Sequence, residues 1–405
     1  MTIGVGGSTA EIELENISDM TTHAKPIEKA EFEARIQKAT ALMKTHQFKA
    51  IYLNAGTNLY YFTGTKWYAS ERLVGALLFA DGTLAYIAPK FEEGTLLGFM
   101  QIKGVVFCWE EHESPYTLLG EVLASHGVAS GNVGLDESTG FFMTDAIQEL
   151  NKAYTFLNAK PVIAPCRMCK SEAEIALIQQ AKNITIEVHK AAARILRPGI
   201  SVNEVKEFIN KAHIKAGIPS GSYFVIVLFG EDSQYPHGVS APQNLVENDV
   251  VLIDTGCQLH GYISDITRTY VYGTPSERHK EIWNLEQATQ KAAFNAAQLG
   301  KTCGSVDDAA RKILENAGLG PDYKLPGLPH RVGHGTGLDI HEYPYLVRGN
   351  TTRLEVGMVM SNEPMICVPG EFGIRHEDHF YMTEDGPKWF TEPMYSIDDP
   401  FGYNR

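Results

Sequence analysis

Residues 248–273 read "NDVVLIDTGCQLHGYISDITRTYVYG" and contain two apolar, strand-like runs joined by a short turn that includes glycine. We place the turn at Leu259 and His260, which sets Asp254 opposite Asp265 on paired strands. Opposed residues of a hairpin share one face of the sheet, with Cβ atoms about 5 Å apart. Burial of two carboxylates so close together is costly unless a cation or a proton neutralises them. The hairpin therefore predicts a metal site.

Residues 359–382, "VMSNEPMICVPGEFGIRHEDHFYM", repeat this geometry around a turn near Gly370. Folding about that turn places Glu363 opposite Glu377. Either pair, taken alone, could equally be a surface ladder with both acids in water. Two such pairs that flank a stretch rich in glycine and histidine favour a shared buried site.

That stretch is "VGHGTGLDIHEYP", residues 332–344, in which His334 and His341 are separated by seven positions. No Gly-Lys-Ser/Thr follows the glycines and no strand–turn–helix frames them, which excludes a phosphate loop, and the histidines lack the i, i+4 spacing of a helical zinc pair. The candidate ligands are Asp254, Asp265, His334, Glu363 and Glu377. Four carboxylates and one imidazole suit two hard divalent ions, Mn²⁺ foremost, with Co²⁺, Fe²⁺ or Zn²⁺ as alternatives. Two such ions can deprotonate a shared water and polarise a carbonyl or phosphoryl oxygen, so the pattern predicts hydrolysis.

The composition excludes several other classes. The chain has 405 residues and 35 Lys+Arg against 49 Asp+Glu, a formal net charge of −14. Phosphate contacts need concentrated cations, so this balance argues against general nucleic-acid or acidic-membrane binding. No apolar run approaches the ~18 residues of a membrane span, and the N-terminus lacks a signal-peptide pattern. Six cysteines in so long a chain do not make a disulfide framework, and Cys166 and Cys169 lack a second pair for zinc, so we expect reduced thiols and a cytoplasmic location.

The length and the pattern of the chain predict two domains. Residues 1–25 are acidic and polar, and we expect a loosely ordered extension there. Residues 26–160 alternate helical and strand-like runs, with a hairpin signal at Asp81-Gly82, which favours an α/β domain. Prolines before a long amphipathic helix mark a boundary near residue 160, so residues 161–405 form the second domain.

Five motifs of the second domain occur together and in order: "YPHGV" at 235–239, "IDTGCQLHGYISDITRTY" at 253–270, "HRVGHGTGLDIHEYP" at 330–344, "SNEPMI" at 361–366 and "GIRHED" at 373–378. In these motifs and their acids the chain resembles the pita-bread metallopeptidases, the family of methionine aminopeptidase, Xaa-Pro aminopeptidase, prolidase and creatinase. The likeness spans about residues 165–395. Residues 28–155, with "NLYYFTG" at 58–64, resemble the N-terminal domain of the prolidase/creatinase branch. The resemblance implies an α+β fold, a small α/β creatinase-like N-terminal domain followed by a pita-bread catalytic domain.

The resemblance also implies roles for residues at matching positions. The metal ligands would be Asp254, which chelates one ion, Asp265 and Glu377, which touch both ions, His334 and Glu363. Glu363 would also be the general base for the bridging water. His237 would stabilise the substrate carbonyl or oxyanion, and His341 would contact that carbonyl or the leaving proline. His330 would bind the same end of the substrate, and Arg375 would either orient the ligands or bind a substrate carboxylate.

These roles imply a dinuclear-metal exopeptidase that hydrolyses the Xaa-Pro bond of dipeptides or short peptides by a metal-bridging hydroxide. Prolidase and Xaa-Pro aminopeptidase both stay open, as does a non-peptidase enzyme on this fold, namely an ectoine-type amide hydrolase, a creatinase-like amidinohydrolase or a sulfonio-acid lyase. The complete ligand set disfavours a metal-free peptide-binding module. The branch often forms homodimers, so Trp67 and Arg72 would either reach a partner subunit's site or lie on a surface loop.

Overall fold

The computed structural model describes residues 1–404 and divides the chain into two compact units. The smaller unit comprises residues 27–167, and the larger unit comprises residues 1–26 together with the chain from Met168 onward. The division thus falls a few residues after the boundary expected near residue 160. No helix within residues 1–404 combines the length and the apolar character that crossing a membrane requires.

The smaller unit is built on one six-stranded sheet with the strand order β4-β3-β2-β1-β5-β6. Strands β2 and β3 form the predicted hairpin at Asp81-Gly82, in which the Gly82 N–H donates to the carbonyl oxygen of Phe79 over 2.9 Å. The elements of this unit are α2 (Lys29–Thr45), β1 (Phe48–Asn54), α3 (Thr57–Thr63), β2 (Gly75–Phe79), β3 (Leu84–Pro89), η1 (Lys90–Glu92), α4 (Glu93–Phe99), β4 (Val105–Trp109), α5 (Pro115–Ser125), β5 (Gly131–Leu135), α6 (Phe141–Leu150), β6 (Tyr154–Asn158) and α7 (Lys160–Met168).

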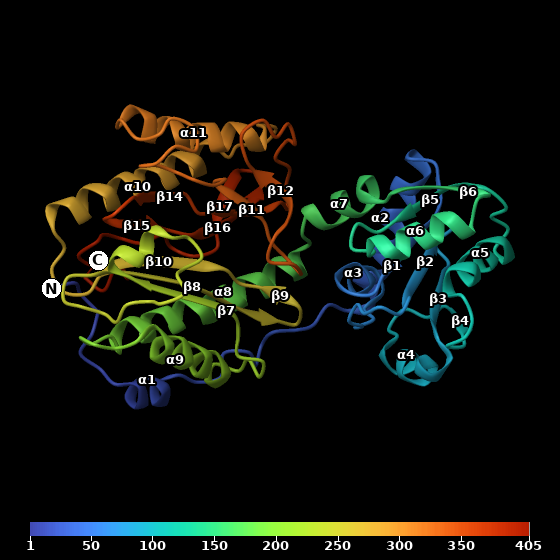
Figure 1. Ribbon diagram of the computed structural model, residues 1–405, viewed down its shortest axis with the longest axis horizontal. Helices are drawn as coiled ribbons and strands as arrows, with labels where there is room; N and C mark the ends of the chain where they lie inside the picture. Colours follow the sequence, from blue (N-terminus) through green and yellow to red (C-terminus); the bar gives the residue numbers. More distant parts are fainter. Residues whose placement is uncertain (405) are drawn as a thin grey trace. The chain divides into compact units, whose positions relative to one another are not determined.

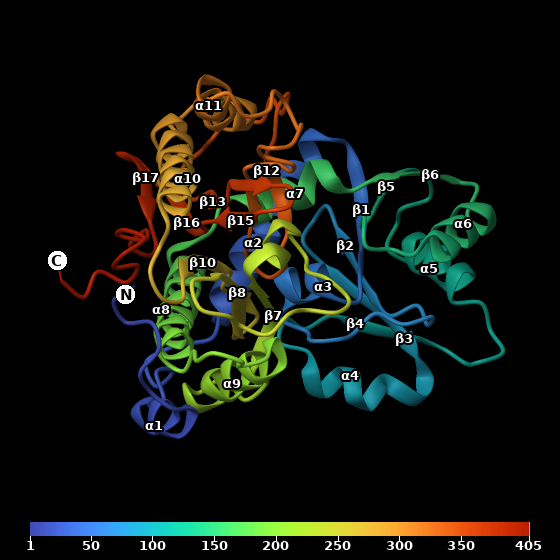
Figure 2. The same ribbon diagram turned by 60° about the vertical axis from the view of Figure 1, so that its left-hand side comes forward.

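The larger unit has three sheets, ordered β10-β8-β7 with β9 paired to β8, β12-β11-β13-β16-β17, and β14-β15. Its elements are α1 (Ala10–Asn16), α8 (Glu172–Arg194), α9 (Val202–Lys215), β7 (Ser222–Phe229), η2 (Gly230–Gln234), β8 (Val250–Leu259), β9 (Tyr262–Ile263), β10 (Ile266–Val271), α10 (Glu277–Ala296), α11 (Cys303–Asn316), β11 (Gly333–Gly335), β12 (Glu342–Leu346), β13 (Val359–Asn362), β14 (Met365–Val368), β15 (Phe372–Arg375), β16 (Asp378–Thr383) and β17 (Gly386–Trp389). The strands lie between the helix pair α8 and α9 on one side and the pair α10 and α11 on the other (Figures 1 and 2).

Residues 1–26, which we expected to be a loosely ordered extension, pack onto α8 in the larger unit. The Thr9 side chain caps α1 by accepting from the backbone N–H of Ile12. The Arg194 guanidinium donates to Oε2 of the buried Glu13 at 2.6 and 2.8 Å. Because these partners lie far along the chain, the polar composition of the segment did not reveal its order.

The first metal-site hairpin has a different register from the predicted one. Leu259 pairs with Tyr262, so the two turn residues are His260 and Gly261, whose φ angles of 49° and 96° fit a tight primed turn. Asp254 therefore lies opposite Thr267, and the predicted pairing with Asp265 is wrong. The shift is two residues, and because side chains alternate with period two, Asp265 stays on the face that carries Asp254.

The second hairpin has the predicted register. Met365 pairs with Arg375 in the short sheet, and Asn362 pairs with Asp378 in the long one. Both ladders have the same register around Gly370, so Glu363 and Glu377 fall opposite each other where the chain passes from one sheet to the other. The sequence thus predicts the second acid pair correctly.

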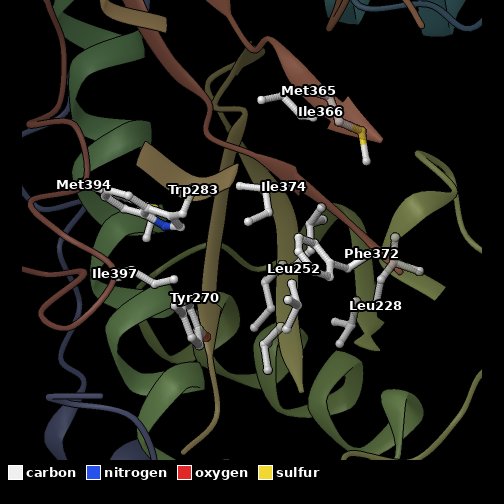
Figure 3. Packing of buried hydrophobic residues seen from close by; sticks show 14 of the residues in the cluster. Leu228, Leu252, Tyr270, Trp283, Met365, Ile366, Phe372, Ile374, Met394 and Ile397 are labelled. Carbon is white, nitrogen blue, oxygen red and sulfur yellow. The ribbon is translucent and has the colours of Figure 1, made fainter. Parts of the chain in front are cut away.

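A large apolar core holds these strands in place (Figure 3). Leu252 on β8 and Tyr270 on β10 pack with Trp283 of α10 and Ile374 of β15, all of them almost fully buried. Burial of one such side chain contributes about 1.5–3 kcal/mol. Trp283 also donates from Nε1 to the carbonyl oxygen of Thr269 over 2.9 Å. The strands that hold the site are therefore packed tightly against the apolar core.

Candidate metal centre

The side chains predicted as metal ligands converge in the larger unit. Asp265, His334 and Glu377 are buried and offer ligand atoms within 4.8 Å of one another. Glu363 adjoins them, with Oε1 at 3.0 Å from Nε2 of His334. Asp254 is linked to the group through Arg375, which donates both to Oδ2 of Asp254 and to the Thr267 hydroxyl that in turn donates to Glu377. These five residues are called the acid cluster below.

His334 presents one ring nitrogen to the acids. Its Nδ1 lies 3.0 Å from the carbonyl oxygen of Gly335, and its backbone N–H donates to Oγ of Ser361 over 2.8 Å. Nε2 then faces Glu363 and, at 3.6 Å, Oδ2 of Asp265. Burial works against a charged ring, but Glu363 outweighs it and raises the pKa of His334. Nε2 is consequently the atom that His334 offers to a cation.

The acids of the cluster carry more negative charge than their neighbours compensate. Burial is the main cause that raises the pKa of Asp254 to about 7, against the opposing effect of Arg375. Burial, followed by the charges of Glu377 and Asp254, also raises the pKa of Asp265 well above its ordinary value. Oδ1 of Asp254 is buried and has no hydrogen-bond partner among the described residues. An oxygen-rich, buried group of this kind with one imidazole fits divalent cations as ligands.

Arg375 is directed toward the ligands. Its side chain is 4 % exposed, and Nη2 donates to Oδ2 of Asp254 over 2.6 Å. Nε donates to the hydroxyl of Thr267 over 3.1 Å, and that hydroxyl donates to Oε2 of Glu377 over 2.8 Å. Of the two roles expected for Arg375, this geometry supports the orientation of metal ligands.

His330 and His341 lie beside the acid cluster. The His341 ring packs edge-on against His334 with 4.2 Å between centroids, and partial burial followed by His334 lowers the pKa of His341 to about 4. Nδ1 of His330 lies 2.7 Å from the carbonyl oxygen of Arg331, and Nε2 is buried without a partner in the described part of the chain. Burial also lowers the pKa of His330, against the opposing charge of Glu363. Both rings are therefore neutral near pH 7.

His237 is placed differently from the other histidines. It is exposed on the loop that follows η2. Its ring has no hydrogen-bond partner among residues 1–404, but the carbonyl oxygen of the preceding Pro236 accepts from Nη1 of Arg375 at 3.5 Å. The structure thus ties the loop of His237 to the cluster through Pro236, while His237 itself is exposed.

The glycines around His334 serve close strand packing. A Cβ added to Gly333 would lie 2.1 Å from the carbonyl oxygen of Ser361, and one added to Gly335 would lie 2.6 Å from that of Tyr343. Strand β11 sits between β12 and β13, so both neighbours crowd it. Only residues without a side chain let His334 occupy this central strand.

Among the residues that touch the ligands, sequence reasoning missed Lys182, His379 and Ser361. Lys182 on α8 is fully buried and donates from Nζ to the carbonyl oxygen of Asp265 over 3.1 Å, and burial lowers the pKa of Lys182 to about 8. Buried lysines are rare unless they are paired. A signal was present, because Lys182 shares the apolar face of its helix with Ile178, Ala181 and Thr185, all of them buried.

The other two missed residues are His379 and Ser361. Nε2 of His379 lies 3.1 Å from Oε1 of Glu377, and Oγ of Ser361 donates to Oε1 of Glu363 over 3.2 Å. Each stands two positions from its acid, so alternation along a strand could have placed both on the ligand face.

In the smaller unit, the two residues considered for a partner's site have local contacts. The Arg72 guanidinium is partly exposed and pairs with Glu71 at 2.6 Å and with Glu111 at 3.1 Å. Trp67 packs edge-on against Phe99 with 6.3 Å between ring centroids.

Comparison with known proteins assigns this architecture to a family. The profile described as "Metallopeptidase family M24" matches residues 176–384, and the profile "Creatinase/Prolidase N-terminal domain" matches residues 35–169. The chain belongs to metallopeptidase family M24. This confirms the resemblance and the α+β fold of a creatinase-type N-terminal domain followed by an M24 catalytic domain. As an M24 protein, the chain is a metal-dependent peptidase.

Relatives cover nearly the whole M24 chain. A Bacillus subtilis protein named "Putative dipeptidase YkvY" is 33% identical over 362 residues, which cover 88% of this chain and 97% of the relative. The structure of dipeptidase PepE from Mycobacterium ulcerans superposes with a TM-score of 0.82 at 30% identity and covers 92% of this chain and 99% of that one. A prolidase from Thermococcus sibiricus superposes with a TM-score of 0.79 at 29% identity, covering 89% and 97%.

Proposed function

We propose that this M24 protein is a dinuclear-metal exopeptidase that hydrolyses the bond before proline in dipeptides or short peptides. The observation that carries the proposal is the acid cluster, in which four carboxylates and one imidazole from strands β8 and β11 and from segments that adjoin β10, β13 and β16 come together. The relatives named dipeptidase and prolidase support a small peptide as the substrate.

The ligand set determines the chemistry that bound ions would contribute. Two divalent ions held by the acid cluster would supply an activated water and polarise the scissile carbonyl. Mn²⁺ is the ion that we propose first, with Co²⁺, Fe²⁺ or Zn²⁺ as alternatives, because most donors are hard carboxylate oxygens.

Glu363 is the proposed general base. Its Oε1 lies at hydrogen-bond distance from two polar groups, Nε2 of His334 and Oγ of Ser361. A carboxylate held at this distance can take a proton from the attacking water and deliver it to the proline nitrogen that leaves.

The histidines around the cluster are proposed to hold the substrate. When Nδ1 of His330 donates to the carbonyl oxygen of Arg331, Nε2 of the neutral ring is an acceptor, which suits an N–H group of the peptide. His341, neutral and edge-on to His334, would contact the substrate carbonyl or the leaving proline. His237 would reach the developing oxyanion from its loop.

A peptide panel tests the proposal. Protein loaded with Mn²⁺ is incubated with Xaa-Pro dipeptides, Xaa-Pro-Yaa tripeptides and matched Xaa-Ala dipeptides, and release of the first residue is measured. Release from the dipeptides alone identifies a prolidase, and release from the tripeptides as well identifies an Xaa-Pro aminopeptidase. No release from any peptide would refute the peptidase proposal, and equal release from Xaa-Ala would refute the preference for proline.

Two further properties are proposed with the function. The six cysteines are free thiols, which suits a reducing compartment, so we place the protein in the cytoplasm. The resemblance to the prolidase/creatinase branch is the basis for proposing a homodimer. Sedimentation of the purified protein checks the second property, and a monomer at micromolar concentration would contradict it.

A further inference from the structure

Two side chains that are not expected ligands stand behind two acids of the cluster in a symmetric arrangement. His379 and Ser361 are paired across strands β16 and β13, and Glu377 and Glu363 lie two positions from them, directly beyond the ends of these strands. Ser361 donates to Oε1 of Glu363 over 3.2 Å, and Nε2 of His379 lies 3.1 Å from Oε1 of Glu377. Each acid is thus held by a side chain two positions away, on the strand that adjoins it.

Glu377 is the more tightly held acid of the two. Oε2 accepts from the Thr267 hydroxyl over 2.8 Å, while Oε1 faces His379. A carboxylate with a donor on each oxygen has little freedom to rotate about its last torsion. This matters because the resemblance assigns Glu377 to both ions, so that rotation would disturb both coordination spheres together.

The His379 ring is itself fixed. The residue is fully buried, and the ring lies roughly perpendicular to that of His334 with 6.0 Å between centroids. With Nε2 turned to a carboxylate oxygen, the ring donates from that nitrogen, since a carboxylate is acceptor-only. The compact group of ligand atoms comprises Asp265, His334 and Glu377, and Nε2 of His379 contacts this group through Glu377.

We infer that His379 is a positioning residue of the metal centre, which orients Glu377 for two-ion binding by donating from Nε2 to Oε1. This inference rests on the proposed metal centre. Removal of a residue that hydrogen-bonds to a metal ligand typically lowers the metal affinity by about 10–100-fold. Ser361 performs the equivalent task for Glu363 with a hydroxyl.

The test compares two amides at position 379 in the full chain. In His379→Gln the side-chain amide can reach the place of Nε2 and keep the donor, whereas the shorter amide of His379→Asn takes the place of Nδ1 and loses it. Mn²⁺ is titrated calorimetrically into metal-free protein. We expect the Kd of the Asn variant to rise about 10–100-fold and that of the Gln variant to stay within about threefold of the unchanged chain.

A matched control is His213→Asn, which alters another buried histidine whose ring contacts Ser222 and Thr185 and none of the acid cluster. We expect it to lower Tm while leaving Mn²⁺ affinity unchanged. Equal Mn²⁺ affinities of the Gln and Asn variants would overturn the inference about His379 but would leave the proposed metal centre intact. If the unchanged chain bound no Mn²⁺, the proposed metal centre itself would fall.

Discussion

Replacement of Arg375 by methionine removes the hydrogen bonds that the guanidinium gives to Asp254 and Thr267 and keeps an unbranched side chain. In the metal-free protein Oδ2 of Asp254 would then lose its ion pair, while Oδ1 has no hydrogen-bond partner among the described residues. Loss of one partner from a buried ion pair typically costs about 3–5 kcal/mol. In a unit of this size each kcal/mol lowers Tm by about 2–4 °C, so we expect a fall of about 6–20 °C.

Thermal unfolding of the metal-free protein, followed by circular dichroism, measures this fall. The control is Arg278→Met, because Arg278 pairs with Glu281 and Glu371 with its side chain 40% exposed. Exposed pairs contribute about 0–1 kcal/mol, so the control should change Tm little. With Mn²⁺ bound, the deficit of the Arg375 variant should shrink, because the ion compensates the charge of Asp254.

A different result would show that Arg375 binds the substrate rather than orients the metal ligands. If both variants kept Tm within about 2 °C of the unchanged chain while Arg375→Met raised KM for dipeptides, the guanidinium would be binding a substrate carboxylate. The structural argument for ligand orientation would then be refuted.

Three further changes have defined outcomes. Glu363→Gln should preserve the circular dichroism spectrum and abolish release of the first residue in the peptide assay; unchanged turnover would identify a different base. Chelation should abolish activity and lower Tm, and Mn²⁺ at about 100 times its Kd should restore about 2.7 kcal/mol of stability; an identical Tm in chelator and in Mn²⁺ would contradict the metal centre. Burial lowers the pKa of His189 to about 3 and that of His213 to about 4. These folded pKa values lie below the unfolded value of about 6.5. The stability that the two neutral rings contribute to the fold is therefore fully present above pH ~6.5 and is lost as the pH falls toward 4. The free energy of unfolding, measured with urea, should therefore fall between pH 7.5 and pH 5, and this fall should shrink by about 4 kcal/mol when both histidines are replaced by Gln; an unchanged fall would refute the assignment of both rings as neutral.

The two hairpins show how far the sequence alone could lead. Around Gly370 the turn is correctly placed, and strand alternation then sets Glu363 opposite Glu377. In the other hairpin the turn lies one residue later than expected, at His260-Gly261, where backbone angles rather than apolar pattern decide the register. Asp265 was still placed on the same face of the sheet as Asp254, because the register shifted by two positions.

The rest of the site depends on contacts that are distant in sequence. Lys182 reaches the Asp265 carbonyl across 83 positions, and the Thr267 hydroxyl reaches Glu377 across 110. A single lysine within a helix has no local pattern that identifies its partner. Hydrophobic periodicity places such residues on a face, but only the packed fold brings the partner to that face.

The position of residues 1–26 has a consequence for anyone who wishes to divide this protein. Met1–Pro26 and the chain from Met168 onward belong to one unit, so the smaller unit is an insertion within the larger one. A fragment that starts near residue 168 would lose the two hydrogen bonds that Thr2 donates to the Gly273 carbonyl oxygen and would leave Arg194 without Glu13. An autonomous catalytic fragment should therefore be made by excision, with a linker that joins Pro26 to Met168, rather than by truncation from the N-terminus.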